Sequence, residues 1–116
     1  SVSGIKNISI EDAKYLFDNG LVNFIDVDLA EAYRDKRIDR AVSMPIDRLD
    51  DMLPGYAGYL NQKPVVVYCH GRGGKSKTAV EKLYNAGHKK VLRLPDGLRK
   101  WESVGYPMYK NPRMGR

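Results

Sequence analysis

The sequence is poor in residues that bind structural metals or form disulfides. Among its 116 residues it has one cysteine, Cys69, and two histidines, His70 and His88. A single cysteine cannot form an internal disulfide, and these three side chains are too few for a cysteine-rich zinc site. We therefore expect neither a disulfide nor a bound metal ion.

Long apolar runs are also lacking. No run approaches the roughly 20 residues that cross a bilayer, so we expect no membrane span. The first residues lack the charged and apolar regions of a secretory signal. With 42% hydrophobic and 29% charged residues, the composition is typical of a soluble globular protein. We expect one soluble domain over residues 1–116, in the cytoplasm or in a bacterial cell envelope.

Acidic residues are scarce in the second half of the chain. Residues 1–58 contain 7 Lys/Arg and 11 Asp/Glu, a balance of −4, whereas residues 59–116 contain 13 and 3, a balance of +10. A basic half attracts a small anionic substrate or an acidic partner protein, although a solvated basic face has the same composition. We expect no nucleic-acid partner, because the lysines are scattered and no nucleic-acid motif accompanies them.

Apolar runs alternate with segments of helical spacing. The expected strands cover residues 22–27, 41–44, 65–68 and 91–94. The expected helices cover residues 10–19, 29–34, 46–53, 75–86 and 97–104. Ser9 is the expected N-cap of the first helix, and Pro54-Gly55 is expected to end the third. Since the strands are nearly continuous apolar runs, the pattern predicts an α/β fold whose parallel sheet is covered on both faces.

The segment 64–76 carries the strongest functional signal. The expected strand 65–68 ends at Cys69, a glycine-rich cationic loop follows, and a helix is expected from Lys75. In an open α/β sheet, ligands bind at this end of the strands. The free N–H groups and dipole of a helix N-terminus favour an anion and so favour the thiolate, the reactive form of cysteine. We predict that Cys69 is a catalytic nucleophile, although most lone cysteines are small core residues.

The residues after Cys69 are candidate ligands for an anionic substrate. Arg72 and Lys75 carry positive charge, and the glycines let backbone N–H groups converge on one point. His70 either influences the thiol or points to solvent, and Ser76 either donates to the thiolate or simply begins the helix. The candidate substrate-binding residues are His70, Gly71, Arg72, Gly73, Gly74, Lys75 and Ser76.

Two known loop patterns match this segment incompletely. Gly74-Lys75-Ser76 fits the end of the nucleotide-binding pattern G-x-x-x-x-G-K-[ST], but Cys69 stands where the first glycine belongs. The spacing Cys69-(x)5-Lys75-Ser76 resembles the C-(x)5-R-[ST] of cysteine phosphatases. Lysine is only a point charge where arginine offers a bidentate fork, and no general-acid aspartate can be identified, so the pattern argues against efficient phosphoryl transfer.

Sulfur transfer makes fewer demands on the loop. A thiolate attacks the outer sulfur of an anionic donor and becomes a persulfide, which a thiophilic acceptor then removes. This chemistry needs an activated nucleophile, N–H donors around the persulfide and positive charge for the donor. Cys69, the amides of residues 70–75, Arg72 and Lys75 would supply these roles. It requires no metal, no organic cofactor and no general acid.

Over most of its length the sequence resembles the single-domain rhodaneses. The matching segments, in the order that the family has them, are 8–13, 24–28, 31–33, 37–45, 65–69, 85–87, 96–101 and 105–107. The resemblance implies a rhodanese-like fold with a five-stranded parallel sheet flanked by helices on both faces. It implies a domain core over about residues 8–109, followed by a basic tail over 110–116. It also implies sulfur transfer from thiosulfate, polysulfide or a persulfide to a thiol or cyanide-like acceptor through a Cys69 persulfide.

The sequence departs from the family pattern at a few positions. Asp28 replaces the usual arginine, Lys36-Arg37 replaces Gly-His, and Asp96 replaces a glycine. The loop is the larger departure, because sulfur-transferring rhodaneses usually have C-(x)4-R, whereas seven-residue loops in this fold belong to phosphatases and arsenate reductases. Our hypothesis is a sulfurtransferase. The alternatives are a phosphatase or arsenate reductase, and a non-catalytic binding module of the same fold.

Overall fold

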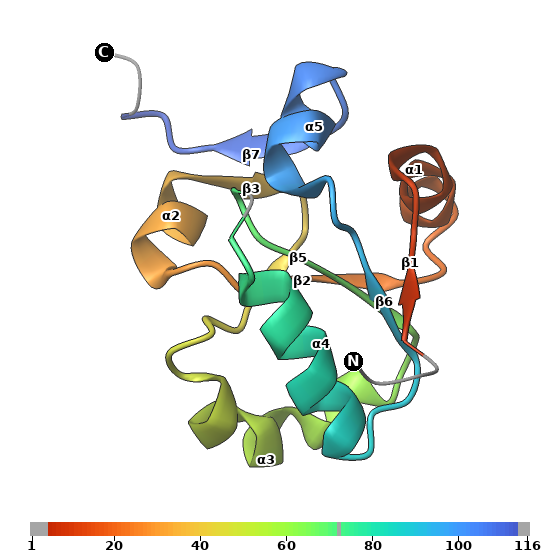
Figure 1. Ribbon diagram of the computed structural model, residues 1–116. Coiled ribbons are helices and arrows are strands. Elements are labelled where there is room, and N and C mark those ends of the chain that lie inside the picture. Colours follow the sequence, from red (N-terminus) through yellow and green to blue (C-terminus); the bar gives the residue numbers. More distant parts are fainter. Residues whose placement is uncertain (1–4, 72, 114–116) are drawn as a thin grey trace.

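Five parallel strands form the central sheet of the computed structural model. The model describes residues 5–71 and 73–113, and Figure 1 shows the arrangement of its elements. The order of the strands across the sheet is β1-β6-β5-β2-β4. The strands are β1 (Lys6–Asn7), β2 (Asn23–Asp26), β4 (Val42–Ser43), β5 (Val65–Tyr68) and β6 (Val91–Arg93). The central strand, β5, pairs with β2 and β6 and is buried along its whole length, as expected for a strand covered on both faces.

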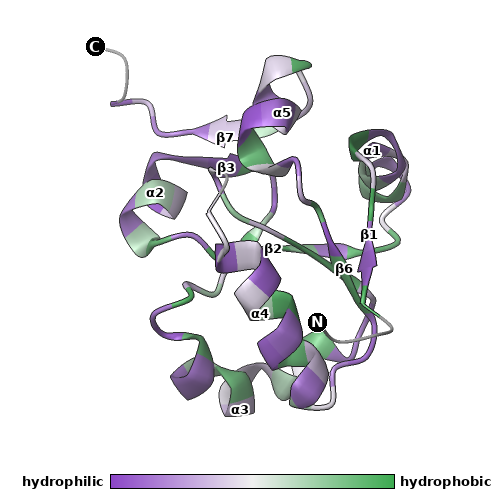
Figure 2. Ribbon diagram, viewed as in Figure 1, coloured by the Kyte–Doolittle hydropathy of each residue, from purple (hydrophilic) through white to green (hydrophobic). Residues whose placement is uncertain are grey.

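Helices cover both faces of this sheet, as the sequence predicts. The helices are α1 (Ile10–Asp18), α2 (Ala30–Asp35), α3 (Leu49–Leu60), α4 (Lys75–Asn85) and α5 (Gly97–Ser103). Along β5 the side chains alternate between two apolar clusters, one with α1 and α5 and the other with α3 and α4. Figure 2 shows hydrophobic and hydrophilic residues side by side on these helices, as amphipathic layers require. None of the helices in the described ranges is long and apolar enough to span a membrane.

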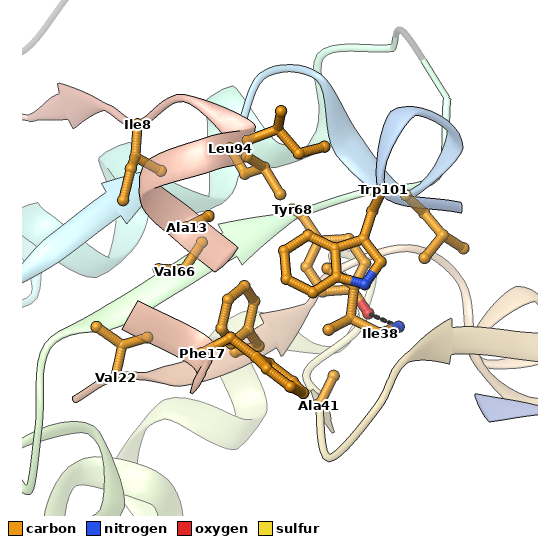
Figure 3. Packing of buried hydrophobic residues seen from close by; sticks show 13 residues of the cluster. Ile8, Ala13, Phe17, Val22, Ile38, Ala41, Val66, Tyr68, Leu94 and Trp101 are labelled. Carbon is orange, nitrogen blue, oxygen red and sulfur yellow. Dashed lines mark hydrogen bonds between the residues drawn. The ribbon is translucent and has the colours of Figure 1, made fainter. Parts of the chain in front are cut away.

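Trp101 lies at the centre of the apolar cluster between the sheet and α1 (Figure 3). Its ring meets Phe17 and Phe24 edge to face at centroid distances of 5.5 Å, and it meets Tyr106 at 5.0 Å. Its Nε1 donates a hydrogen bond to the Pro107 carbonyl at 2.8 Å. These contacts fix α5 against the sheet, and α5 in turn borders the loop after β5.

Three strands were not expected from the sequence. β1 has two exposed residues at the edge of the sheet, so it carries no apolar run that could reveal it. β3 (Lys36–Ile38) and β7 (Met108–Lys110) form a separate antiparallel pair. Arg37 stacks between the rings of Tyr33 and Tyr109, at 4.3 and 3.9 Å. Lys110, which we expected to begin a basic tail, therefore belongs to β7.

The expectation that Pro54-Gly55 ends the third helix was wrong, because α3 continues past it to Leu60. Proline lacks the N–H that would bond the carbonyl four residues earlier, which weakens a helix interior. Leu49 and Leu60, at the two ends of α3, are both buried in the cluster shared with α4. Tertiary packing of this kind contributes most of a helix's stability and outweighs one missing bond.

The start of α5 fits closely against the end of β5. Gly97 has a φ of +68°, and a Cβ at this position would lie 2.7 Å from the carbonyl oxygen of Cys69. The N–H of Leu98 donates to that same oxygen at 3.0 Å. Gly105 also has a positive φ, +80°, but a Cβ there would meet nothing within 4 Å.

We expect Gly97→Ala to lower the free energy of unfolding more than Gly105→Ala. Both substitutions force a left-handed conformation on alanine, which costs roughly 1–2 kcal/mol. Gly97→Ala adds a clash with backbone, worth a further 1–3 kcal/mol or so. Urea unfolding of both variants measures the difference. Equal losses in the two variants would contradict the close fit between α5 and Cys69.

Candidate active site

Cys69 follows the last residue of the central strand directly, as predicted. The residue is 3% exposed, and it packs in the cluster formed with α4. Its carbonyl accepts a hydrogen bond from Leu98, and α4 begins six residues later at Lys75. The predicted order of strand, cysteine, loop and helix is therefore confirmed.

The thiol of Cys69 has two carbonyl oxygens as its hydrogen-bond partners among the described residues. The oxygen of Gly71 lies 3.6 Å from Sγ, and that of Gly73 lies 3.9 Å away. Both are acceptors, so they suit a protonated thiol that donates its hydrogen. A thiolate or a persulfide in this place needs N–H donors instead, which requires the loop to turn these peptide groups away.

Two aspartates at the end of β2 hold the first residue of the loop. His70 Nε2 lies 2.7 Å from Asp26 Oδ2, and the His70 N–H donates to Asp28 Oδ2 at 2.8 Å. The N–H of Asp28 in turn donates to Asp26 Oδ1 at 3.0 Å. Asp26 is fully buried, and the His70 side chain is 17% exposed. The imidazole is thus fixed at the carboxyl end of the sheet rather than directed freely into solvent.

The surroundings of Asp28 favour its ionised form. Burial by itself disfavours the charge, but the N–H groups of His70 and Leu29 and the nearby Lys75 ammonium together lower the pKa of Asp28 below its ordinary value. The Lys75 Nζ lies 3.7 Å from Asp28 Oδ1. Part of the positive charge of Lys75 is therefore already balanced by a carboxylate of the protein.

Tyr68 lies beneath the histidine. Its ring stacks parallel to that of His70 at a centroid distance of 6.3 Å, and its hydroxyl accepts the N–H of Ile38 at 3.0 Å (Figure 3). Burial, followed by the charge of the neighbouring Asp26, raises the pKa of Tyr68 well above its ordinary value. Its hydroxyl therefore stays neutral at physiological pH and serves the scaffold.

A cavity of about 690 Å³ opens beside the loop. Its size is in the range of small-molecule sites. The residues that line it are His70, Gly71, Gly73, Arg93, Pro95, Asp96, Arg99, Lys100 and Ser103. Three of these side chains are cationic and one is acidic, so the cavity favours an anionic ligand. A smaller cavity of about 340 Å³ shares His70, Gly71 and Arg99 with it.

The predicted ligands do not all face this cavity. His70, Gly71 and Gly73 line it, whereas Lys75 contacts Asp28. The hydroxyl of Ser76, a residue only 1% exposed, accepts a hydrogen bond from Arg93. The remaining candidates are Gly74, which is the N-cap residue of α4, and Arg72, which lies outside the described residues.

Sequence reasoning missed three cations of the cavity. Arg93 ends β6, and Arg99 and Lys100 lie on α5. Carboxyl ends of parallel strands share one edge of a sheet, which is where ligands bind. Basic residues at the end of the expected strand 91–94 and within the following helix were therefore a usable signal.

Comparison with known proteins gives one family. The model of the rhodanese-like domain family matches residues 9–104. An uncharacterized protein of Synechocystis sp. is 31% identical over 90 residues, which are 77% of this chain and 48% of that protein. An HTH-type transcriptional regulator of Mycobacterium tuberculosis is 28% identical over 96 residues, which are 83% of this chain and 41% of that protein. The chain thus spans less than half the length of these two relatives.

Solved structures with the same fold have differing descriptions. The rhodanese-like domain of an Anabaena protein has a TM-score of 0.79 and 26% identity, covering 95% of this chain and 84% of that one. A Rhodopseudomonas palustris protein described as a possible tyrosine phosphatase has a TM-score of 0.77 and 26% identity, with coverages of 92% and 86%. The thiosulfate sulfurtransferase of Pseudomonas aeruginosa has a TM-score of 0.78, with coverages of 92% and 20%. At 20% identity, this last match shows the shared fold alone.

We expect Asp28→Asn to destabilise the protein at neutral pH and to matter less in acid. The folded-state pKa of Asp28 is lowered, so its contribution is present above the unfolded-state value near 4 and is lost as the pH falls through the folded-state value. At pH 7 the loss should be about 1–3 kcal/mol, typical of hydrogen bonds to a charged group.

Urea unfolding at pH 7 and at pH 3 measures this difference. The exposed Asp47 provides the control, and Asp47→Asn should change the unfolding free energy by less than about 0.5 kcal/mol. A gap between wild type and Asp28→Asn that is equally large at both pH values would contradict the role of the Asp28 charge.

Proposed function

Because this chain belongs to the rhodanese-like domain family, we propose that it is a sulfurtransferase acting through a persulfide on Cys69. The observation that carries the proposal is the position of the one thiol. It lies at the carboxyl end of the central strand, directly before His70 and Gly71, which line a cavity with three cationic side chains. The donor is an anionic sulfane-sulfur compound, and the acceptor is a thiol or a cyanide-like nucleophile.

The first half-reaction loads the enzyme. The Cys69 thiol loses its proton to solvent, and the thiolate attacks the outer sulfur of thiosulfate. A bond forms between Sγ and that sulfur, while the sulfur–sulfur bond of the donor breaks and its electron pair leaves with sulfite. In the second half-reaction, cyanide or a thiolate attacks the terminal sulfur of the persulfide and leaves as thiocyanate or a new persulfide, which restores the Cys69 thiolate.

The charges around the loop suit this reaction. Arg93, Arg99 and Lys100, which line the cavity, attract a dianionic donor and stabilise the negative charge that develops on the leaving sulfite. Formation of a persulfide needs no general acid, because sulfite leaves as an anion. The Asp26 and Asp28 carboxylates hold the His70 end of the loop and take no part in bond making.

One observation favours a second candidate, a cysteine phosphatase or arsenate reductase. The spacing from Cys69 to Lys75 matches the longer loop of such enzymes, and Asp96 places a carboxyl group in the cavity where a general acid could protonate a leaving group. The Rhodopseudomonas palustris protein that shares the fold is described as a possible tyrosine phosphatase. We place this chemistry second because the loop ends in Lys75, and lysine lacks the planar fork with which arginine binds an oxyanion.

We expect the purified protein to gain one sulfur, about 32 Da, when it is incubated with thiosulfate or polysulfide. Cyanide should remove the added mass, and Cys69→Ser should gain none. Intact mass spectrometry measures each step, with circular dichroism to show that the variant is folded. A mass gain of the same size in Cys69→Ser would place the sulfur elsewhere and refute the mechanism.

We also expect no release of phosphate from an aryl phosphate and no reduction of arsenate. If phosphate is released while no sulfur is gained, the second candidate replaces the first. In that event Asp96→Asn should lower the turnover roughly 100-fold or more, the usual contribution of a general acid. The exposed Asp47 serves again as the control, since Asp47→Asn should leave turnover unchanged.

A further inference from the structure

A guanidinium matches the paired oxygens of a sulfonate or carboxylate better than an ammonium does, because it offers parallel donors in one plane. The loop after Cys69 ends in Lys75, whose ammonium lies near Asp28. The part of the loop that the structure describes therefore contains no cation free of a carboxylate partner. Among the described residues, guanidinium groups reach the cavity from β6 and α5.

Arg93, the last residue of β6, lies where such a ligand is needed. In the sheet it pairs with Val67, two residues before Cys69, and its side chain lines the cavity together with His70, Gly71 and Gly73. It is half-buried, so its charge is less screened by water than that of a fully exposed side chain. Among the ion pairs of the described residues, none includes Arg93.

Ser76 fixes the orientation of the Arg93 guanidinium. Its Oγ accepts a hydrogen bond from Arg93 Nε at 2.9 Å. Ser76 is in the first turn of α4 and is 1% exposed, so this contact is sheltered from water. The bond uses the single donor on Nε and leaves the two Nη groups for a ligand.

We propose that Arg93 is the principal ligand of an oxyanion subsite beside Cys69 and that Ser76 positions it. The subsite binds the sulfonate end of donors such as thiosulfate or an organic thiosulfonate, with two oxygens facing the two Nη groups. β6 thereby supplies the fork that the end of the loop lacks. The identification of the ligand as a sulfur donor rests on the proposed function, whereas the anion subsite itself does not.

The contributions of Arg99 and Lys100 are of a different kind. Both are exposed on α5, so they raise the local concentration of anions but are screened by salt. Removing either one should weaken anion binding at low ionic strength and matter little at high ionic strength. The contribution of Arg93 should persist at high ionic strength, because it acts by direct contact.

Binding to an unreactive variant tests the subsite without chemistry. In the Cys69→Ser background, thiosulfate binding is followed by NMR titration in 0.3 M sodium chloride. Adding Arg93→Gln should weaken binding roughly 10- to 100-fold, the range for a charge-assisted pair. Lys90→Gln is the matched control, because it removes one charge from the exposed residue at the other end of β6, and it should change binding less than twofold.

Two further variants test whether Arg93 acts through the shape of its guanidinium and whether Ser76 positions it. Arg93→Lys keeps the charge but not the fork, so it should recover only a part of the lost affinity. Ser76→Ala should raise the KM for thiosulfate several-fold and leave kcat unchanged. Equal losses of thiosulfate affinity in Arg93→Gln and Lys90→Gln would show that binding depends on overall positive charge and not on a specific site, and would overturn the proposal. A failure of Cys69→Ser to bind thiosulfate would overturn it as well.

The rates of sulfur gain by proteins that retain Cys69 complete the test. Arg93→Gln should slow sulfur gain from thiosulfate roughly 10- to 100-fold. It should slow gain from dimethyl trisulfide less than twofold, because this neutral donor passes its central sulfur to Cys69 and leaves, after attack by the released methanethiolate, as dimethyl disulfide. Equal slowing with both donors would overturn the proposed role. If wild type gains no sulfur from either donor while Cys69→Ser still binds thiosulfate through Arg93, the subsite stands and the sulfurtransferase function fails.

Discussion

The geometry of the loop after Cys69 depends on the contact between the buried carboxylate of Asp26 and His70. A carboxylate withdrawn from water must be hydrogen-bonded, or its burial is strongly unfavourable. Asp26 is satisfied by His70 Nε2 and by the N–H of Asp28, and Asp28 holds the N–H of His70. The end of β2 therefore fixes His70, the residue that follows Cys69, and with it the start of the loop. Since the strands β2 and β5 are adjacent, the two aspartates reach the loop without any long connection.

The rest of the site follows from the parallel topology. All strands of the central sheet end at one edge, so Cys69, Asp26 and Arg93 meet there although they are far apart in the sequence. The tight contact of Gly97 with the Cys69 carbonyl brings α5 and its cations to the same edge. Acidic groups hold the loop on the β2 side, and cationic groups line the cavity on the β6 side. The lining of the cavity thus includes neither of the two aspartates that hold the loop.

Much of this arrangement could be predicted from the sequence. Local sequence patterns predict the strand 65–68, the position of Cys69 after it, and a parallel sheet covered on both faces. β1 and the β3–β7 pair were not, because their residues are mostly polar and their pairing is set by distant segments. The prediction that Pro54 ends a helix was wrong, because burial of the residues at both ends of α3 outweighs the helix-breaking preference of proline. Arg93 and its bond to Ser76 also escaped notice, since that contact joins two elements whose relative position only the fold determines.

In the proposed reaction, Cys69 accepts the outer sulfur of an anionic donor. The most direct measurement uses two samples of thiosulfate, one with radioactive sulfur in the outer position and one with it in the sulfonate position. After removal of free donor, we expect label on the protein from the first sample alone, released by cyanide as thiocyanate. Label retained from the sulfonate position, or none from the outer position, would contradict a Cys69 persulfide and with it the sulfurtransferase assignment.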